Sequence, residues 1–320
     1  MFKAITRHTR SLVAVPSLTA TLLAVGISPS AGQATQFNPP KQYYLALGDS
    51  IAYGFQRSTF EGGLPASAFN TGYVDVFAAR LRNIQPDLTI VNYGCPGETT
   101  MSFTTSPCGW PAVGQLHDSY TGSQLEAALA FLRAHRGEVS PITLTLWGND
   151  VREFVSGCSD DICVQNGAFR FVVEFSDRLK GILSALRNAA PDAEIIITGS
   201  WDSFLDALEF ADPLFQLLNA SMSATAATAR VRFADPFPLF NPQGDLGDEI
   251  RTMCILTLLC TKNDSHPSDA GYRALADLVF DVSDYERLDH AASTDPQQPE
   301  VVRSQRLSTA FGVKRLAHRL

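Results

Sequence analysis

Two residues of this chain have the type and the surroundings that nucleophilic catalysis requires. Ser50 directly follows an apolar run, in the segment Gly48-Asp49-Ser50, and His266 precedes a proline near the start of a predicted helix. A serine hydroxyl becomes a nucleophile when a histidine takes its proton, so this pair predicts acyl transfer. Taken alone, Gly-Asp-Ser is also an ordinary turn sequence, whose residues supply backbone freedom and local hydrogen bonds.

Two further positions can supply donors to an oxyanion. Gly94 and Asn149 each follow another apolar run. The backbone N–H groups of Ser50 and Gly94, together with the Asn149 amide, can bind the negative oxygen that develops during acyl transfer. Each position alone has a simpler explanation, because Gly94 fits a turn and Asn149 fits a helix cap. The hypothesis therefore depends on their joint occurrence at the ends of predicted strands.

The elements that must position these residues alternate along the chain. Apolar runs predict strands over 43–47, 88–93, 141–147, 194–198 and 231–234, and apolar residues at helical spacing predict helices over 72–83, 123–136, 169–188, 213–230 and 268–282. We expect loops over 59–70 and 235–267. Strands that alternate with helices of this length form a parallel sheet covered on both faces. The carboxyl ends of its strands share one edge, so the predicted site lies there, with His266 folded back over it.

Given these residues, the chain resembles the SGNH (GDSL) hydrolase family, which is named for the Ser, Gly, Asn and His of four sequence blocks. The blocks occur in order within residues 43–282, as Gly48-Asp49-Ser50, Asn92-Tyr93-Gly94-Cys95-Pro96-Gly97-Glu98-Thr99-Thr100, Asn149-Asp150, and His266-Pro267 with Gly271-Tyr272. The resemblance implies a flavodoxin-like α/β fold, a three-layer α/β/α sandwich with a five-stranded parallel sheet of order 2-1-3-4-5. It also implies hydrolysis of carboxylic esters with no cofactor and no metal, as in secreted bacterial lipases and esterases.

Two positions depart from the family pattern. Trp147 stands where the third block usually has a glycine, and its bulk can crowd or shape the site. The family places an aspartate three residues before the histidine, where this chain has Asn263, and the carboxylate follows one residue later, at Asp264. We expect Asp264 to orient His266, because a carboxylate also stabilises the imidazolium that forms in the reaction. The Asn263 amide oxygen and a backbone carbonyl are the alternatives.

Residues 1–34 have the features of a secretory signal peptide. Lys3, Arg7 and Arg10 precede an apolar stretch over 11–27, and small residues follow it. The alternative, a membrane anchor, needs about 20 uninterrupted apolar residues, and a proline interrupts this stretch. We therefore expect a secreted protein, extracellular or in the cell envelope, with a hydrolase domain over 35–285 and a basic tail over 286–320.

Six cysteines fall into three pairs that are close in sequence. In an oxidising compartment, ease of loop closure favours local disulfides between them. The rival interpretation is a zinc site, but no pair has the Cys-x2-Cys spacing and no histidine is in register. We therefore expect the disulfides Cys95–Cys108, Cys158–Cys163 and Cys254–Cys260.

The charge is unevenly distributed. The chain has a net charge of −8, although residues 301–320 hold five basic and no acidic residues. The remainder is strongly acidic, which argues against a nucleic-acid partner. The basic tail is either a solvated, disordered segment or a weak contact for anionic membrane surfaces.

These observations predict a secreted serine esterase or lipase, most simply a monomer, that acts on small-molecule or lipid esters through an acyl-serine. Apolar side chains that can bind an acyl chain, or merely pack in the core, are Phe55, Phe60, Leu64, Phe204, Leu205, Leu208, Phe210, Leu214 and Phe215. The alternatives are a carbohydrate or polysaccharide deacetylase of the same fold and a non-catalytic surface-binding protein.

Overall fold

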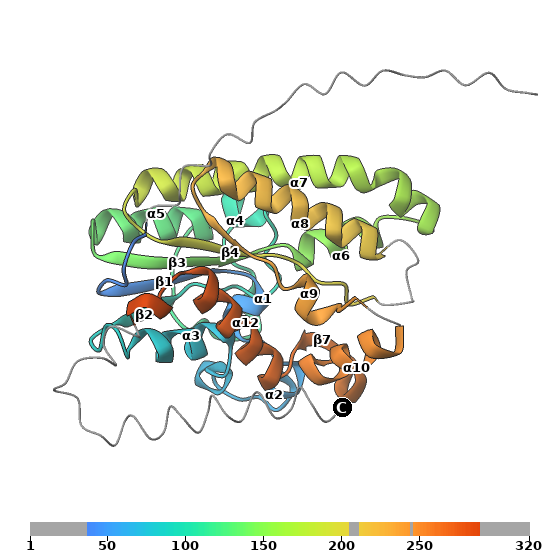
Figure 1. Ribbon diagram of the computed structural model, residues 1–320, viewed down its shortest axis with the longest axis horizontal. Helices are drawn as coiled ribbons and strands as arrows, with labels where there is room; N and C mark the ends of the chain where they lie inside the picture. The colour runs from blue at the N-terminus through green and yellow to red at the C-terminus, as the bar shows by residue number, and fades with distance from the viewer. Residues whose placement is uncertain (1–36, 205–210, 244–245, 289–320) are drawn as a thin grey trace, which may run out of the picture. The chain divides into compact units, whose positions relative to one another are not determined.

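A five-stranded parallel sheet forms the centre of the computed structural model, which describes residues 37–204, 211–243 and 246–288 (Figure 1). The strand order is β2-β1-β3-β4-β5, with bounds of Tyr43–Gly48 (β1), Thr89–Asn92 (β2), Val139–Thr145 (β3), Ile195–Thr198 (β4) and Arg232–Ala234 (β5). Every residue of β3 and β4 is buried, as expected where helices cover both faces of a parallel sheet. The predicted fold class and strand order are confirmed.

Helices form the two outer layers (Figure 1). On one face lie α3 (Tyr73–Leu81) and α12 (Asp269–Val282), and on the other lie α5 (Gln124–Ala134), α7 (Asp161–Ala189) and α8 (Ala211–Thr228). Side-chain caps fix several of their starts, since Ser123, Asp160 and Ser268 each accept a hydrogen bond from a backbone N–H of the first turn. Their buried apolar residues follow the helical spacing seen in the sequence.

The structure has more helices than the sequence pattern predicts. A helix, α6 (Gly148–Ser156), begins directly after β3, and α7 starts at Asp161, eight residues before the predicted start at residue 169. The start of α6 is polar, and the first turn of α7 leaves Ile162 exposed, so neither start shows the apolar pattern of a buried helix face. The segment expected as a loop over 59–70 contains α2 (Arg57–Glu61) and the short 3-10 helix η1 (Ala66–Phe69).

The expected loop over 235–267 is also structured. It folds as α9 (Phe237–Phe240), α10 (Leu246–Leu256) and α11 (Leu259–Lys262), and a small antiparallel pair consists of β6 (Thr257–Leu258) and β7 (Asp264–Pro267). The remaining short elements are α1 (Ser50–Tyr53), α4 (Ser102–Thr105) and η2 (Trp110–Ala112). His266 therefore lies in an extended strand, where a loop was expected.

Three disulfides close the segments around the carboxyl edge of the sheet. Cys95–Cys108 spans the segment after β2, Cys158–Cys163 joins α6 to α7, and Cys254–Cys260 joins α10 to α11 just before β7. These are the pairs expected from the sequence. Closing loops of this kind typically contributes about 2–4 kcal/mol each.

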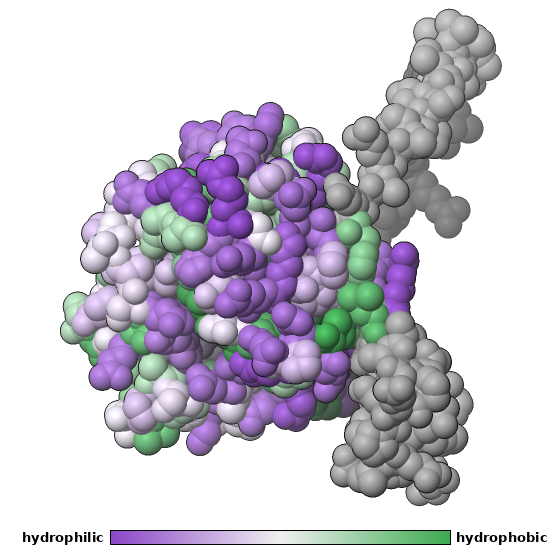
Figure 2. All heavy atoms as spheres, turned by 90° about the vertical axis from the view of Figure 1, so that its left-hand side faces the viewer, coloured by the Kyte–Doolittle hydropathy of each residue, from purple (hydrophilic) through white to green (hydrophobic). Residues whose placement is uncertain are grey.

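The surface turned to the viewer in Figure 2 is mostly hydrophilic, with hydrophobic residues scattered over it. Scattered apolar residues are normal on a protein surface. Within the described residues, no helix combines the length and the apolarity needed to cross a lipid bilayer.

The folded body continues beyond α12. Tyr285 is 0% exposed, and its hydroxyl donates a hydrogen bond of 2.9 Å to the carbonyl oxygen of Asn38. Its ring packs edge-on against Phe37 and stacks on Phe77, while Asp284 pairs with Arg232 at 3.1 Å. The residues just after α12 thus close the end of the core on which the first described residues also pack. The proposed domain end at residue 285 remains a prediction.

A truncation series tests where the folded body ends. We expect a chain that ends after Leu288 to keep the thermal midpoint of the full chain. A chain that ends after Asp284 should lose about 3–5 kcal/mol of unfolding free energy, because it lacks the buried Tyr285 ring. Equal midpoints for the two chains, measured by circular dichroism, would show that Tyr285 does not support the core.

Candidate active site

Ser50 is delivered by a tight turn at the end of β1. Gly48 has a φ of +128°, and a Cβ there would lie 1.9 Å from the carbonyl oxygen of Thr145 in β3, so only glycine permits this approach of the two strands. Asp49 then caps α1, because its Oδ1 accepts a 2.8 Å hydrogen bond from the N–H of Ile51. Ser50 is the first residue of this helix, which turns its side chain out of the sheet.

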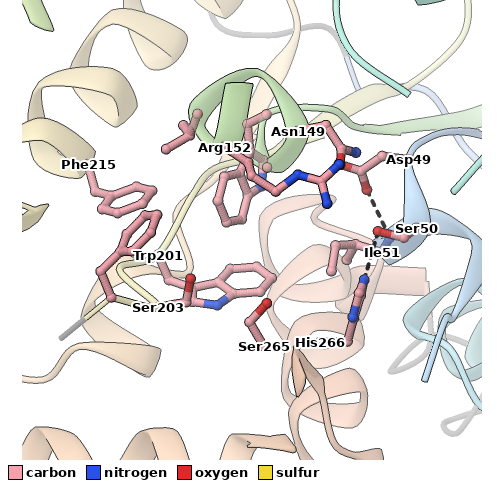
Figure 3. Close-up of a pocket in the computed structure, with 14 residues that line it drawn as sticks. Asp49, Ser50, Ile51, Asn149, Arg152, Trp201, Ser203, Phe215, Ser265 and His266 are labelled. Atoms are coloured by element: carbon pink, nitrogen blue, oxygen red, sulfur yellow. Dashed lines mark hydrogen bonds between the residues drawn. The ribbon is translucent and has the colours of Figure 1, made fainter. Parts of the chain in front are cut away.

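The structure brings Ser50, His266 and Asp264 into one hydrogen-bonded chain, of which Figure 3 shows the link between Ser50 and His266. His266 Nε2 lies 2.9 Å from Ser50 Oγ, and His266 Nδ1 lies 2.5 Å from Asp264 Oδ1. The second carboxylate oxygen, Oδ2, accepts a 2.8 Å hydrogen bond from the N–H of Arg57. This is the arrangement in which a histidine can take a serine proton while a carboxylate holds the other ring nitrogen.

The geometry of β7 explains why Asp264 can contact His266 although it departs from the family register. In an extended strand, residues i and i+2 point to the same face, which places these two side chains side by side. Asn263 has a φ of +49° and an exposed side chain, and it ends α11 before the strand begins. Within the described residues neither Asn263 nor a backbone carbonyl contacts His266 Nδ1, so the geometry favours Asp264 among the three alternatives.

The surroundings of Asp264 keep it ionised. Burial alone would raise the pKa of this carboxyl, which is 1% exposed. The hydrogen bond and charge of His266, together with the backbone N–H groups of Arg57 and His266, outweigh burial and hold the pKa below its ordinary value. The Phe55 ring packs on the His266 imidazole at 4.7 Å and further fixes its orientation.

Asn149 and Gly94 occupy different environments. Asn149 lies in the first turn of α6 and lines the same cavity as Ser50, and its Nδ2 donates one hydrogen bond, of 2.9 Å, to the carbonyl oxygen of Glu98. The amide group keeps a second N–H. The Gly94 N–H, however, already donates to Asn92 Oδ1 at 2.9 Å, and a Cβ on Gly94 would lie 2.7 Å from the Tyr53 nitrogen. The structure therefore gives no support to Gly94 as an oxyanion donor.

Gly97, in the same sequence block, is a better placed donor. The Glu98 N–H bonds to the Cys95 carbonyl at 3.1 Å, which closes a turn with Pro96 and Gly97 at its centre. The φ of Gly97 is +93°, as a type II turn requires at this position, and its N–H has no partner among the described residues. The carbonyl oxygen of Glu98, the residue after Gly97, accepts the hydrogen bond from Asn149 Nδ2. This turn therefore lies beside the Asn149 amide. The Pro96-Gly97 pair is the signal in the sequence that marks this turn.

Buried acids lie beneath the site. Burial raises the pKa of Asp49 to about 7, and the nearby Asp150 carboxylate adds to this, while backbone N–H groups of Ile51, Trp147 and Gly148 oppose it. Asp150 accepts hydrogen bonds from the N–H and hydroxyl of Thr100 and lies 3.5 Å from Arg178. Both aspartates thus connect separate segments around the site, which is a structural role.

A cavity of about 270 Å³ opens beside Ser50 and His266 (Figure 3). Its apolar walls include Trp147, Trp201, Phe204 and Phe215. Trp147, at the position where the family usually has a glycine, packs edge-on against Trp201 at 4.8 Å and shapes the wall without blocking the cavity.

The other apolar candidates have varied places. Leu214 is fully buried in the core. Phe60 and Leu64 line a separate hollow beside Trp110. Three candidates, Leu205, Leu208 and Phe210, lie outside the described residues.

The described residues contain one group of carboxylates whose oxygens lie within 4.8 Å of one another, formed by Asp202, Asp212 and Glu249. Proximity alone does not make a metal site, and we assign this group no role.

Comparisons with known proteins agree with this geometry. The profile of the GDSL-like lipase/acylhydrolase family matches residues 46–274. Similar solved structures include a Parabacteroides merdae protein described as a GDSL-like lipase, with 18% identity, a TM-score of 0.51, and coverage of 78% of this chain and 98% of that one. Phospholipase A1 from Streptomyces albidoflavus has 19% identity and a TM-score of 0.50, and the match covers 75% of this chain and 99% of that one.

A variant of an acetyl xylan esterase from Geobacillus stearothermophilus has 19% identity and a TM-score of 0.50, and the match covers 78% of this chain and 97% of that one. At such identities the likeness of these structures shows the fold alone. A comparison with curated proteins gave no match.

Substitutions at two adjacent residues test what orients His266. We expect Asp264→Asn to lower kcat by up to about 10⁴, because the amide cannot stabilise an imidazolium. Asn263→Ala should leave kcat on a short p-nitrophenyl ester nearly unchanged, since its side chain is exposed. If kcat falls strongly only for Asn263→Ala, then Asn263 and not Asp264 orients His266. Near-normal kcat for both variants would mean that Ser50 and His266 act as a dyad.

The raised pKa of Asp49 predicts a pH-dependent stability. Between the unfolded value near 4 and the folded value of about 7, the native state binds a proton that the unfolded state does not. The contribution of Asp49 to the free energy of unfolding is fully present below about pH 4 and is lost as the pH rises through about 7. Relative to wild type, Asp49→Asn should therefore gain on the order of 2–4 kcal/mol of unfolding free energy from about pH 4 to about pH 8. A difference between the two proteins that is constant over this range, in urea titrations, would refute the raised pKa.

Proposed function

The chain belongs to the GDSL-like lipase/acylhydrolase family, and on that premise we propose that it hydrolyses carboxylic esters through an acyl intermediate on Ser50. The observation that carries this proposal is the 2.9 Å contact between His266 Nε2 and Ser50 Oγ, with the buried Asp264 on the other ring nitrogen. Non-catalytic binding would require no such alignment, so the contact also argues against a surface-binding protein.

The proposed reaction proceeds in two halves. His266 takes the Ser50 proton as the hydroxyl oxygen attacks the ester carbonyl, and Asp264 stabilises the imidazolium that results. The N–H groups of Ser50 and Gly97 and the Asn149 amide bind the oxyanion. His266 then protonates the departing alcohol, and water, activated by the same histidine, releases the acid from Ser50.

The cavity beside Ser50 is large enough for an acyl or alcohol part of modest size in the ester substrate. Its volume of about 270 Å³ and its aromatic walls suit a short or medium apolar chain. The same aromatic walls also suit a sugar, so a carbohydrate deacetylase remains the second candidate. The two activities differ in acyl-chain preference, because a deacetylase accepts acetate alone.

We further propose that the protein is secreted and acts as a monomer on a small-molecule or lipid ester, without a nucleic-acid partner. Three disulfides suit an oxidising compartment. The segments expected as a signal peptide and as a basic tail with weak membrane contact fall outside the described residues, apart from residues 286–288 of the tail. Their roles therefore rest on the sequence.

Removal of the Ser50 hydroxyl tests the reaction class. We expect Ser50→Ala to lower kcat by at least about 10⁴ on p-nitrophenyl esters, with almost no change in thermal midpoint, because the hydroxyl serves chemistry and not packing. The wild-type protein should be assayed on the same esters from acetate to long acyl chains. Activity on acetate alone would favour the deacetylase, and near-normal activity of Ser50→Ala would refute the proposal.

A further inference from the structure

Arg152 is a cation in the candidate active site that the proposed reaction does not use. It follows Asn149 by three residues in α6, and residues at this spacing lie on the same helix face. Both line the cavity that holds Ser50 and His266. In Figure 3 the Arg152 side chain extends from α6 toward the side on which Ser50 lies.

The guanidinium of Arg152 has no carboxylate partner within the described residues. Arg178 and Arg232, by contrast, form ion pairs with Asp150 and Glu194. Asp49 also lines the cavity, but backbone N–H groups occupy its carboxylate and it makes no ion pair with Arg152. A positive charge is thus kept beside the nucleophile of a protein whose net charge is −8.

Further hydrogen-bond donors without partners line the same cavity. The indole N–H groups of Trp147 and Trp201 are buried, and neither has a hydrogen-bond partner among the residues that the structure describes. The hydroxyls of Ser203 and Ser265 make no hydrogen bond with another described residue, and Figure 3 shows both beside Trp201. The cavity therefore offers several donors beside the Arg152 guanidinium, which suits a ligand that carries several acceptor oxygens.

We propose that Arg152 recognises an anionic group on the ester substrate, so that the enzyme prefers esters that carry a phosphate or carboxylate close to the scissile bond. This inference rests on the proposed function, because it assigns the substrate class of the same site. The guanidinium binds the anion through charge-assisted hydrogen bonds, and the unpartnered donors around it donate hydrogen bonds to the remaining oxygens of the ligand. The aromatic walls hold the apolar part of the substrate.

Matched soluble esters test the proposal. The probes are dibutanoylglycerol with its third hydroxyl converted to a methyl phosphodiester, to a carboxymethyl ether or to a neutral methyl ether, and a pH-stat follows butyrate release. Wild type should hydrolyse one or both anionic esters with a higher kcat/KM than the neutral ester. Arg152→Gln should lower kcat/KM for the preferred anionic ester about 10-fold, mainly through KM, and leave the neutral ester within about 2-fold.

The matched control is Arg170→Gln, which removes the same charge from an exposed arginine of α7 that does not line this cavity. It should change neither substrate's kinetics. A fall for the phosphodiester alone identifies phosphate as the anion, and a fall for the carboxymethyl ether alone identifies carboxylate. Equal effects of Arg152→Gln on all three esters, or wild-type activity on the neutral ester with no anionic preference, would overturn the inference. That last result would leave the proposed function intact, since only Ser50→Ala tests it.

Discussion

The close approach of β1 and β3 at their carboxyl ends is the constraint on which the site depends. A side chain at Gly48 would collide with the Thr145 carbonyl, so glycine alone lets the two strands pair to their last residues. The carboxylate of Asp49, the next residue, accepts hydrogen bonds from backbone N–H groups of α1 and of the start of α6. Ser50 and Asn149 leave the sheet on either side of this contact, so their relative position is set by the backbone before either side chain is considered.

The sheet and the nucleophile could be predicted from the sequence because their signals are local. Buried apolar runs, helices of regular spacing and a Gly-Asp-Ser segment identify the fold and Ser50 without knowledge of tertiary contacts. Short helices such as α6 are polar on average and too short for an extended apolar pattern, and their position depends on packing against distant segments. The choice between Gly94 and Gly97 also depends on a long-range fact, since only the structure shows that Asn92 already holds the Gly94 N–H.

The pairing of His266 shows how a departure from a family pattern can be compensated by local structure. The sequence leaves Asp264, Asn263 and a backbone carbonyl as alternatives, because residue spacing does not reveal backbone conformation. The left-handed Asn263 and the extended β7 decide the geometry, since they align alternate residues on one face. The pattern of the family is therefore one solution to the requirement for a carboxylate at the imidazole, and the strand of this chain is another.

The division of the site between two sheets has a mechanical consequence. Ser50 directly follows β1 of the central sheet, at the start of α1, whereas His266 and Asp264 lie together on β7 of the β6–β7 ribbon. The Cys254–Cys260 bond joins α10 and α11, the helices that flank β6. A shift of this ribbon against the sheet changes the distance between nucleophile and base, while the base and its carboxylate move as one body. The acid–base pair is thus assembled within a single strand, and the Ser50–His266 hydrogen bond joins that strand to the central sheet.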